Sequence, residues 1–153
     1  MGSRYKGTAK EVRALNAFVA LERAAESVES ATQAEIVRAR LTQSQFGVLE
    51  ALLHLGPLCA KDLARKILRS KGNLTLVVEN LEKAGLVSRT ARVEDRRYLT
   101  VELTAKGRRL IVGMFPRHAG GILKAFSALT GEEQEELRRL CRKLGKAQGK
   151  EAV

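Results

Sequence analysis

Two groups of polar side chains in the middle of the chain could bind a polyanion through hydrogen bonds and charge. The first group opens a segment with helical spacing, and the second marks a turn between two short segments rich in β-branched residues. Asparagine can contact adenine bidentately, lysine can reach guanine or phosphate, and arginine is attracted into a narrow minor groove. The first group is Ser70, Lys71, Asn73 and Thr75, and the second is Asp95, Arg96 and Arg97. Together they predict recognition of duplex DNA.

Most of these side chains also have an ordinary structural explanation. Asn73 is favoured for a base contact, although it could instead bond locally at the start of a helix. Ser70 is already explained as a helix N-cap. Arg97 is favoured for the minor groove, although it could pair only with Asp95 and shape the turn. Two further arginines precede the turn and are interpreted as phosphate contacts or as ordinary solvated charges: Arg89 and Arg92.

A helix and a two-stranded ribbon must position the two groups. The helix is predicted over residues 70–84, and Gly85 supplies its left-handed cap. Four apolar residues at helical spacing form its buried stripe, Leu74, Val77, Val78 and Leu81. The β-branched segment 87–93 and the alternating segment 98–104 bracket the turn and predict a hairpin. This order can place a helix in a major groove and a cationic hairpin on the neighbouring minor groove.

Other helices are predicted on both sides of this unit. Residues 8–30 have a wide apolar side, and residues 59–68 form a shorter helix. Between them, Thr42 and Gln45 form a capping box for a helix that Gly56 and Pro57 end. A long helix over 106–129 is expected to be bent or interrupted at Pro116 and the pair Gly120 and Gly121. The last predicted helix starts with a second capping box, Thr130 with Glu133, and continues to 146.

Composition fits one folded domain with an anionic partner. The 153 residues carry 28 Lys and Arg against 17 Asp and Glu, a formal net charge of +11. Such a charge suits a nucleic acid, although charge alone does not separate DNA from RNA or an anionic membrane surface. No stretch reaches the roughly 20 apolar residues of a spanning helix, and no secretory signal is evident. We therefore expect a single domain over 1–153, a cytoplasmic location and no membrane partner.

Enzymatic and metal chemistry are not predicted. The sequence has no phosphate-binding glycine loop, nucleophile elbow or paired carboxylate motif, and no cofactor is expected. His54 and His118 are far apart and belong to no metal-ligand motif. His118, beside Arg117 on a long helix, could meet an anionic or phenolic ligand in a cleft. The alternative, a polar residue at a helix bend, is favoured over this pocket role.

Two cysteines leave a redox role open. Cys59 lies near the start of the 59–68 helix, where backbone amides and Lys61 could stabilise a thiolate. Cys141 lies on an apolar helical stripe and is interpreted as a small hydrophobic residue. With no CxxC pairing, neither a disulfide framework nor a structural zinc site is expected.

Residues 41–107 resemble the MarR family of winged-helix transcription regulators, and the resemblance extends over nearly the whole chain. Its most specific part combines LEKAGLV at 81–87 with a later set, Asp95, Arg97, Leu103, Thr104 and Gly107. The resemblance implies an α+β, mostly α fold with a winged helix-turn-helix over 41–104. It also implies dimerisation through helices 8–30 and 106–146, a DNA-contacting arginine at 97 and an aspartate at 95 that organises the wing.

The residues and the resemblance together predict a homodimeric repressor of a pseudopalindromic operator. The apolar surface of the outer helices exceeds what one small winged-helix lobe covers, which independently favours a second chain. Release from DNA by a small aromatic ligand is expected. The alternatives are a nonspecific architectural DNA-binding protein, a winged-helix protein-interaction module, and a thiol-based redox regulator that uses Cys59. The family's oxidant sensors carry their reactive cysteine in the N-terminal helix, where this chain has none.

Overall fold

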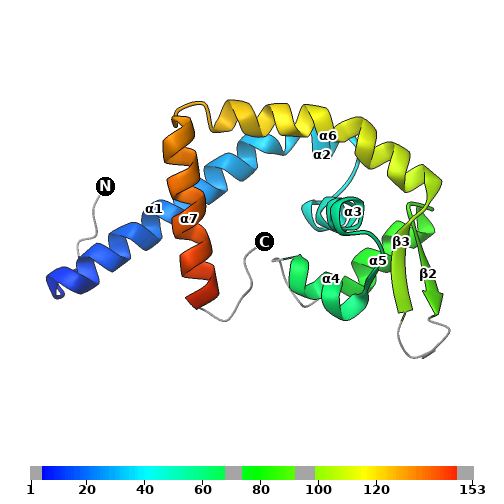
Figure 1. The fold of residues 1–153 in the computed structure, drawn as a ribbon, viewed down its shortest axis with the longest axis horizontal. Coiled ribbons are helices and arrows are strands. Elements are labelled where there is room, and N and C mark those ends of the chain that lie inside the picture. The colour runs from blue at the N-terminus through cyan, green and yellow to red at the C-terminus, as the bar shows by residue number, and fades with distance from the viewer. Residues whose placement is uncertain (1–4, 68–73, 92–98, 148–153) are drawn as a thin grey trace.

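The computed structural model describes residues 5–67, 74–91 and 99–147 and is mainly helical, with one small sheet (Figure 1). This is the α+β, mostly α winged-helix class that the sequence predicts. The elements in order are α1 (Ala9–Thr32), α2 (Ala34–Arg38), α3 (Gln43–Leu55), β1 (Leu58–Cys59), α4 (Ala60–Lys66), α5 (Leu74–Lys83), β2 (Val87–Ala91), β3 (Leu99–Leu103), α6 (Ala105–Ala125) and α7 (Gly131–Ala147).

Short polar motifs set several helix ends. The predicted capping box of α3 is confirmed, because the Gln45 amide N–H donates to Thr42 Oγ1 at 3.2 Å while Gln45 Oε1 accepts from the Thr42 N–H at 2.8 Å. Thr130 and Glu133 make the same reciprocal contacts before α7. At the end of α5, Gly85 has a φ of 70°, the left-handed conformation expected of its cap. Local sequence therefore fixes these boundaries.

The sheet has the antiparallel strand order β1-β3-β2. In the β2–β3 pairing, Val87 lies opposite Leu103 and Arg89 lies opposite Val101, so these residues share one face of the sheet. Ser88 lies opposite Glu102 on the other face. Val87 and Val101 are buried, so the first face is the one that packs on the core.

The core lies between α3, α5, the sheet and the first half of α6. Apart from Ile36 of α2, its helical members come from helices that the sequence predicts, and the strands contribute one inward residue each from β2 and β3. The buried apolar residues are Ile36, Phe46, Val48, Leu49, Leu52, Leu63, Val78, Leu81, Leu86, Val87, Val101, Ile111 and Met114. This core fixes α5 and the hairpin to the same framework.

Three features differ from the predicted elements. The five-residue helix α2 and the two-residue strand β1 were not predicted. The predicted long helix was expected to be either bent or interrupted at Pro116 and the glycine pair. The helix α6 contains Pro116 and runs without interruption, and Figure 1 shows it bending along its length, so the interruption does not occur. A proline removes one backbone N–H, and the remaining bonds of a 21-residue helix carry the chain past it. The predicted N-cap Ser70 lies outside the described residues.

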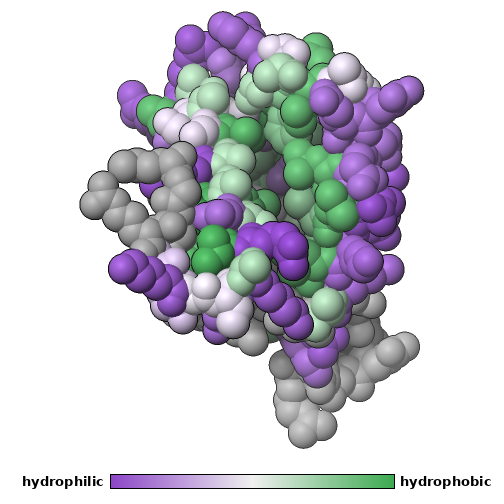
Figure 2. Space-filling view, turned by 90° about the vertical axis from the view of Figure 1, so that its left-hand side faces the viewer, coloured by the Kyte–Doolittle hydropathy of each residue, from purple (hydrophilic) through white to green (hydrophobic). Residues whose placement is uncertain are grey.

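The outer helices keep large apolar side chains exposed. Neither α1 nor α7 contains a buried residue. Figure 2 views the molecule from the left-hand side of Figure 1 and shows apolar side chains on both sides of a hollow. The exposed large apolar residues of α1, α6 and α7 are Phe18, Leu21, Val112, Ile122, Leu123, Leu137, Leu140 and Leu144. Among the described residues, no helix has the length and apolar character needed to cross a membrane.

Candidate nucleic-acid interface

The helix α5 packs one side on the core and leaves the other exposed. Val78 and Leu81 are buried, whereas Thr75 and Asn80 are exposed. Of the polar residues predicted at its start, Thr75 lies within the described helix, and Ser70, Lys71 and Asn73 lie outside the described residues. Asn80 was not singled out from the sequence, because the prediction considered only the first turn. The exposed positions at 76, 80 and 83, which follow helical spacing, are the signal that could have found it.

The hairpin stands beside α5 at one end of the molecule (Figure 1). On its outer face, Ser88 Oγ and Thr90 Oγ1 both approach Glu102 Oε1, at 3.5 and 3.4 Å. The predicted turn residues Asp95, Arg96 and Arg97 lie outside the described residues, and so does Arg92, which the sequence predicts in the strand before that turn. Because α5 and the strands on either side of that turn are adjacent, the structure brings the supports of both predicted groups together.

An ion pair joins α5 to β2. The Arg89 Nε–H donates to Glu82 Oε2 at 2.8 Å, and Nη2 donates to the same oxygen. This hydrogen bond from Arg89 lowers the pKa of Glu82, and the same contact raises the pKa of Arg89. Both side chains remain about one-third exposed. Sequence reasoning named Arg89 but missed Glu82 as its partner, because the two residues belong to different elements.

The first turn of α6 holds the C-terminal end of α5. Thr104 Oγ1 donates to the carbonyl oxygen of Gly85, and Lys106 Nζ donates to that of Ala84, both at 2.7 Å. Gly107 is buried against Leu86, where a Cβ on Gly107 would lie 1.9 Å from the Leu86 carbonyl oxygen. Helix α6 therefore approaches the end of α5 closely enough to carry a displacement to it.

His118 lies further along α6, in an aromatic cluster with α3. Its side chain is 6% exposed, and its ring centroid is 4.5 Å from that of Phe46 and 6.3 Å from that of Phe115. The Phe115 ring also meets the exposed His54 edge-on, with centroids 5.0 Å apart. Among the described residues, His118 Nδ1 is buried without a hydrogen-bond partner, and so is Gln43 Oε1 at the start of α3. An unpaired buried polar atom is costly, which makes this cluster a candidate ligand site.

The cysteines and histidines form no evident redox or metal centre in the described part of the chain. Cys59 Sγ donates to Asp62 Oδ2 at 3.0 Å, so its visible contact is a carboxylate and not the predicted Lys61 cation. Cys141 is exposed on α7. Across residues 5–67, 74–91 and 99–147, no group of three or more His, Cys, Asp or Glu could hold a metal ion.

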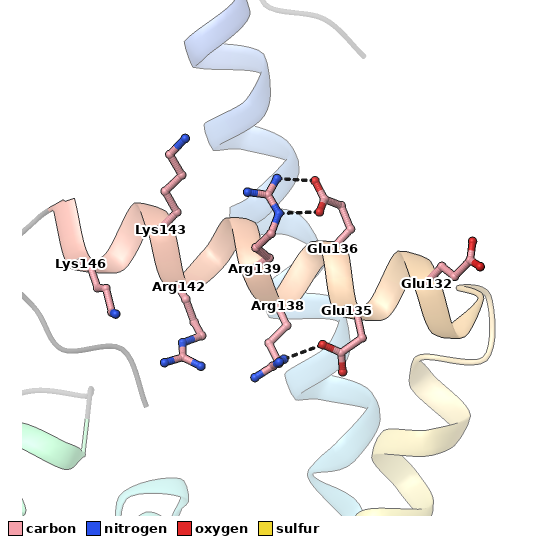
Figure 3. Close-up of a pocket in the computed structure, with 8 residues that line it drawn as sticks. All are labelled: Glu132, Glu135, Glu136, Arg138, Arg139, Arg142, Lys143 and Lys146. Atoms are coloured by element: carbon pink, nitrogen blue, oxygen red, sulfur yellow. Dashed lines mark hydrogen bonds and ion pairs between the residues drawn. The ribbon is translucent and has the colours of Figure 1, made fainter.

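Charged side chains cover one side of α7 (Figure 3). Arg138 Nε donates to Glu135 Oε2 at 2.9 Å, and Arg139 Nε donates to Glu136 Oε2 at 2.7 Å. The remaining side chains of this surface extend along the same helix, Glu132, Arg142, Lys143 and Lys146. A depression lined by one exposed helix encloses little, so we assign it no ligand.

Comparisons with known proteins give one consistent answer. A model of the MarR family matches residues 41–99. The chain is 34% identical to the HTH-type transcriptional regulator MhqR of Bacillus subtilis (strain 168), over 87% of this chain and 92% of the relative. Two solved structures also match closely. BpsR of Bordetella bronchiseptica, whose DNA binding is regulated by 6-hydroxynicotinic acid, has a TM-score of 0.75 at 29% identity, covering 84% of this chain and 98% of that chain. NadR in complex with 4-hydroxyphenylacetate has a TM-score of 0.74 at 25% identity, covering 95% and 99%.

Proposed function

Since the chain belongs to the MarR family of DNA-binding transcriptional regulators, we propose that it is a homodimeric cytoplasmic repressor that a small aromatic ligand releases from its operator. The observation that carries this proposal is the attachment of α5 and the β2–β3 hairpin to one core, with the outer side of α5 exposed. A helix and a hairpin held in this way can enter neighbouring grooves of one duplex. Repression follows if the bound dimer blocks a promoter.

The proposed DNA contacts divide into base-reading and backbone contacts. We call α5 the recognition helix, and of the predicted base-reading group only Thr75 lies within its described residues. Asn73, which precedes α5 in the sequence, is proposed to read a base, with support from Ser70, Lys71 and Thr75. In the hairpin, which we call the wing, Arg97 is proposed to enter the minor groove beside Arg96, with Asp95 shaping the turn. Arg92 is proposed to contact phosphate. The net charge of +11 supports the sequence-independent part of this binding.

The dimer is proposed to form through the outer helices, residues 8–30 and 106–146, and the DNA-binding region is proposed to span 41–104. The exposed apolar residues of α1, α6 and α7 support this assignment, because a monomer would leave that whole face in water. A two-fold dimer presents two copies of α5. Half-sites about 34 to 36 Å apart would accept both copies on one side of the DNA.

The ligand is proposed to bind at the aromatic cluster of His118. Phe46 and Phe115 offer ring faces, while the unpaired Nδ1 of His118 offers a hydrogen bond to a hydroxyl or carboxyl group. The aromatic acids associated with BpsR and NadR have this combination of ring and polar group. An aromatic ligand with one hydroxyl or carboxyl substituent is therefore the proposed chemical class.

Helix α6 supplies a physical connection from this aromatic cluster to the proposed DNA-binding surface. It carries His118 near its middle, while Thr104 and Lys106 at its beginning hold the carbonyl end of α5. A ligand that favours one position of α6 would therefore shift the separation of the two recognition helices. It releases DNA only if its affinity differs between the DNA-bound and free conformations.

Selection of bound genomic fragments tests specificity and ligand response together. The full-length protein would be mixed with fragmented genomic DNA, with and without 4-hydroxyphenylacetate or 6-hydroxynicotinic acid as probes. We expect a small set of enriched fragments that share an inverted repeat, and less enrichment with a suitable aromatic acid. Equal recovery of all fragments would support a nonspecific architectural protein and contradict the proposed function.

A further inference from the structure

Arg89 lies on the inward face of β2, and it is the last residue on that face whose side chain the structure describes. It shares its face of the sheet with Val87 and Val101, which are buried, and this face packs against α5. The guanidinium of Arg89 therefore points back towards the recognition helix, where it donates twice to one oxygen of Glu82. The ion pair of Arg89 with Glu82 therefore joins β2 to α5 two residues before β2 ends at Ala91.

The position of Glu82 requires an explanation of its own. Glu79 and Glu82 are one turn apart on a helix that meets a polyanion, and each carboxylate should weaken DNA binding by repulsion. The negative charge of Glu79 also contributes to the raised pKa of Arg89, but Glu82 is the residue that accepts the hydrogen bonds from Arg89. A carboxylate at position 82 should therefore weaken DNA binding unless its contact with Arg89 strengthens that binding in another way.

We propose that Glu82 and Arg89 are positioning residues, which fix the angle between the recognition helix and the wing, and that Arg89 is not a phosphate contact. The pair ties the end of α5 to β2 two residues beyond Val87, which is the buried core residue of that strand. With the tie in place, helix and wing meet the DNA as one preorganised unit, and no affinity is lost to ordering them. This inference rests on the proposed operator binding.

The substitution Glu82→Gln gives a test in which repulsion and positioning predict opposite signs. It removes a negative charge near DNA, so repulsion alone predicts tighter binding. Loss of the ion pair instead predicts weaker operator binding, by about two- to fivefold. Glu79→Gln is the matched control, since it removes the same charge from the same helix, and it should bind as tightly as the wild type or more tightly. The exchanged pair Glu82→Arg with Arg89→Glu should recover affinity relative to either single variant.

The salt dependence separates positioning from a phosphate contact. For Arg89→Met, positioning predicts weaker binding with an unchanged slope of log affinity against log salt concentration. Loss of a phosphate contact would instead reduce that slope by about 0.9. A reduced slope for Arg89→Met, or tighter operator binding by Glu82→Gln, would overturn the proposal.

Amide hydrogen exchange in DNA-free protein provides a test that does not depend on the operator. Loss of the tie should speed exchange in Val87–Ala91 and Leu99–Leu103 for Glu82→Gln and Arg89→Met, but not for Glu79→Gln. Unchanged exchange in the first two variants would overturn the inference even if the wild type binds its operator. If the wild type binds no specific DNA while exchange changes as expected, the proposed function fails and the tie stands.

Discussion

His118 is a polar residue in an apolar environment. Its ring lies between Phe46 and Phe115, and within the described residues its Nδ1 has no partner. A hydrogen bond from a ligand hydroxyl would remove the cost of burying this nitrogen unpaired. Its burial, and the lack of a partner among the described residues, support its place in the proposed ligand site better than its position beside Arg117 in the sequence does.

The variant His118→Phe should separate stability from ligand response. It removes the unpaired nitrogen and keeps an aromatic ring, so the free energy of unfolding should rise by about 1 kcal/mol. Release of DNA by 4-hydroxyphenylacetate should be lost. Urea unfolding and operator titration measure the two effects, with His54→Phe as the control at the exposed end of the cluster. A destabilised variant that still responds to the ligand would refute the assignment.

Gly107 tests the close approach of α6 to the end of α5. A Cβ at this position would lie 1.9 Å from the Leu86 carbonyl oxygen, so Gly107→Ala must displace backbone and should destabilise the protein by about 2 kcal/mol or more. Gly113→Ala is the matched control on the same helix, where no atom lies within 4 Å of the added Cβ. That variant should gain roughly 0.5 to 1 kcal/mol. Thermal unfolding compares the two, and equal stabilities would argue against the tight joint.

Elements whose signals are local could be predicted from the sequence. The capping boxes at Thr42 and Thr130, the left-handed cap at Gly85 and the hairpin strands each depend on neighbouring residues, and each is present. The strand β1 could not be predicted in this way, because two residues have no periodicity and Leu58 pairs with the distant Val101. Helix α2 is too short for a repeating apolar pattern.

The candidate site could be predicted only in part, because local sequence indicates residue types but not their partners in distant elements. Residue types indicated which side chains could bind DNA, but partners across elements are set by tertiary packing. The contact between Glu82 and Arg89, and the burial of His118 against Phe46, both join residues from different helices or strands. The predicted residues at 70, 71, 73, 92 and 95–97 lie outside the described residues, so their roles stay predictions.

Helix α7 tests the role of the outer helices. Its exposed Leu137, Leu140 and Leu144 form a stripe that the protomer leaves uncovered. Leu140→Glu would bury a charge at a two-fold interface, so the dimer dissociation constant should rise more than tenfold. Lys143→Gln makes the same change in charge on the charged side of the helix and should leave the dimer intact. Sedimentation at several concentrations distinguishes them, and an unaltered Leu140→Glu dimer would rule out this interface.

At the scale of the whole molecule, the proposed function makes affinity and specificity depend on pairing two protomers. One copy of α5 and one wing cover a single half-site, whereas a linked pair binds the second half-site at a high effective concentration. The monomeric Leu140→Glu variant should therefore lose operator preference while keeping weak, salt-sensitive binding to any duplex. If the proposed dimer is correct, specific regulation requires the outer helices as much as the recognition surface.

The most direct measurement is the ratio of affinities for an inverted-repeat operator and a shuffled duplex, determined at fixed salt for the wild type, Asn73→Ala and Arg97→Ala. The account predicts a wild-type ratio of at least about a thousandfold, with two chains bound to each operator. Asn73→Ala should lower the ratio more than it weakens binding to shuffled DNA, and Arg97→Ala should weaken operator binding and reduce its salt dependence. A wild-type ratio near one, or full operator affinity in both variants, would contradict the account.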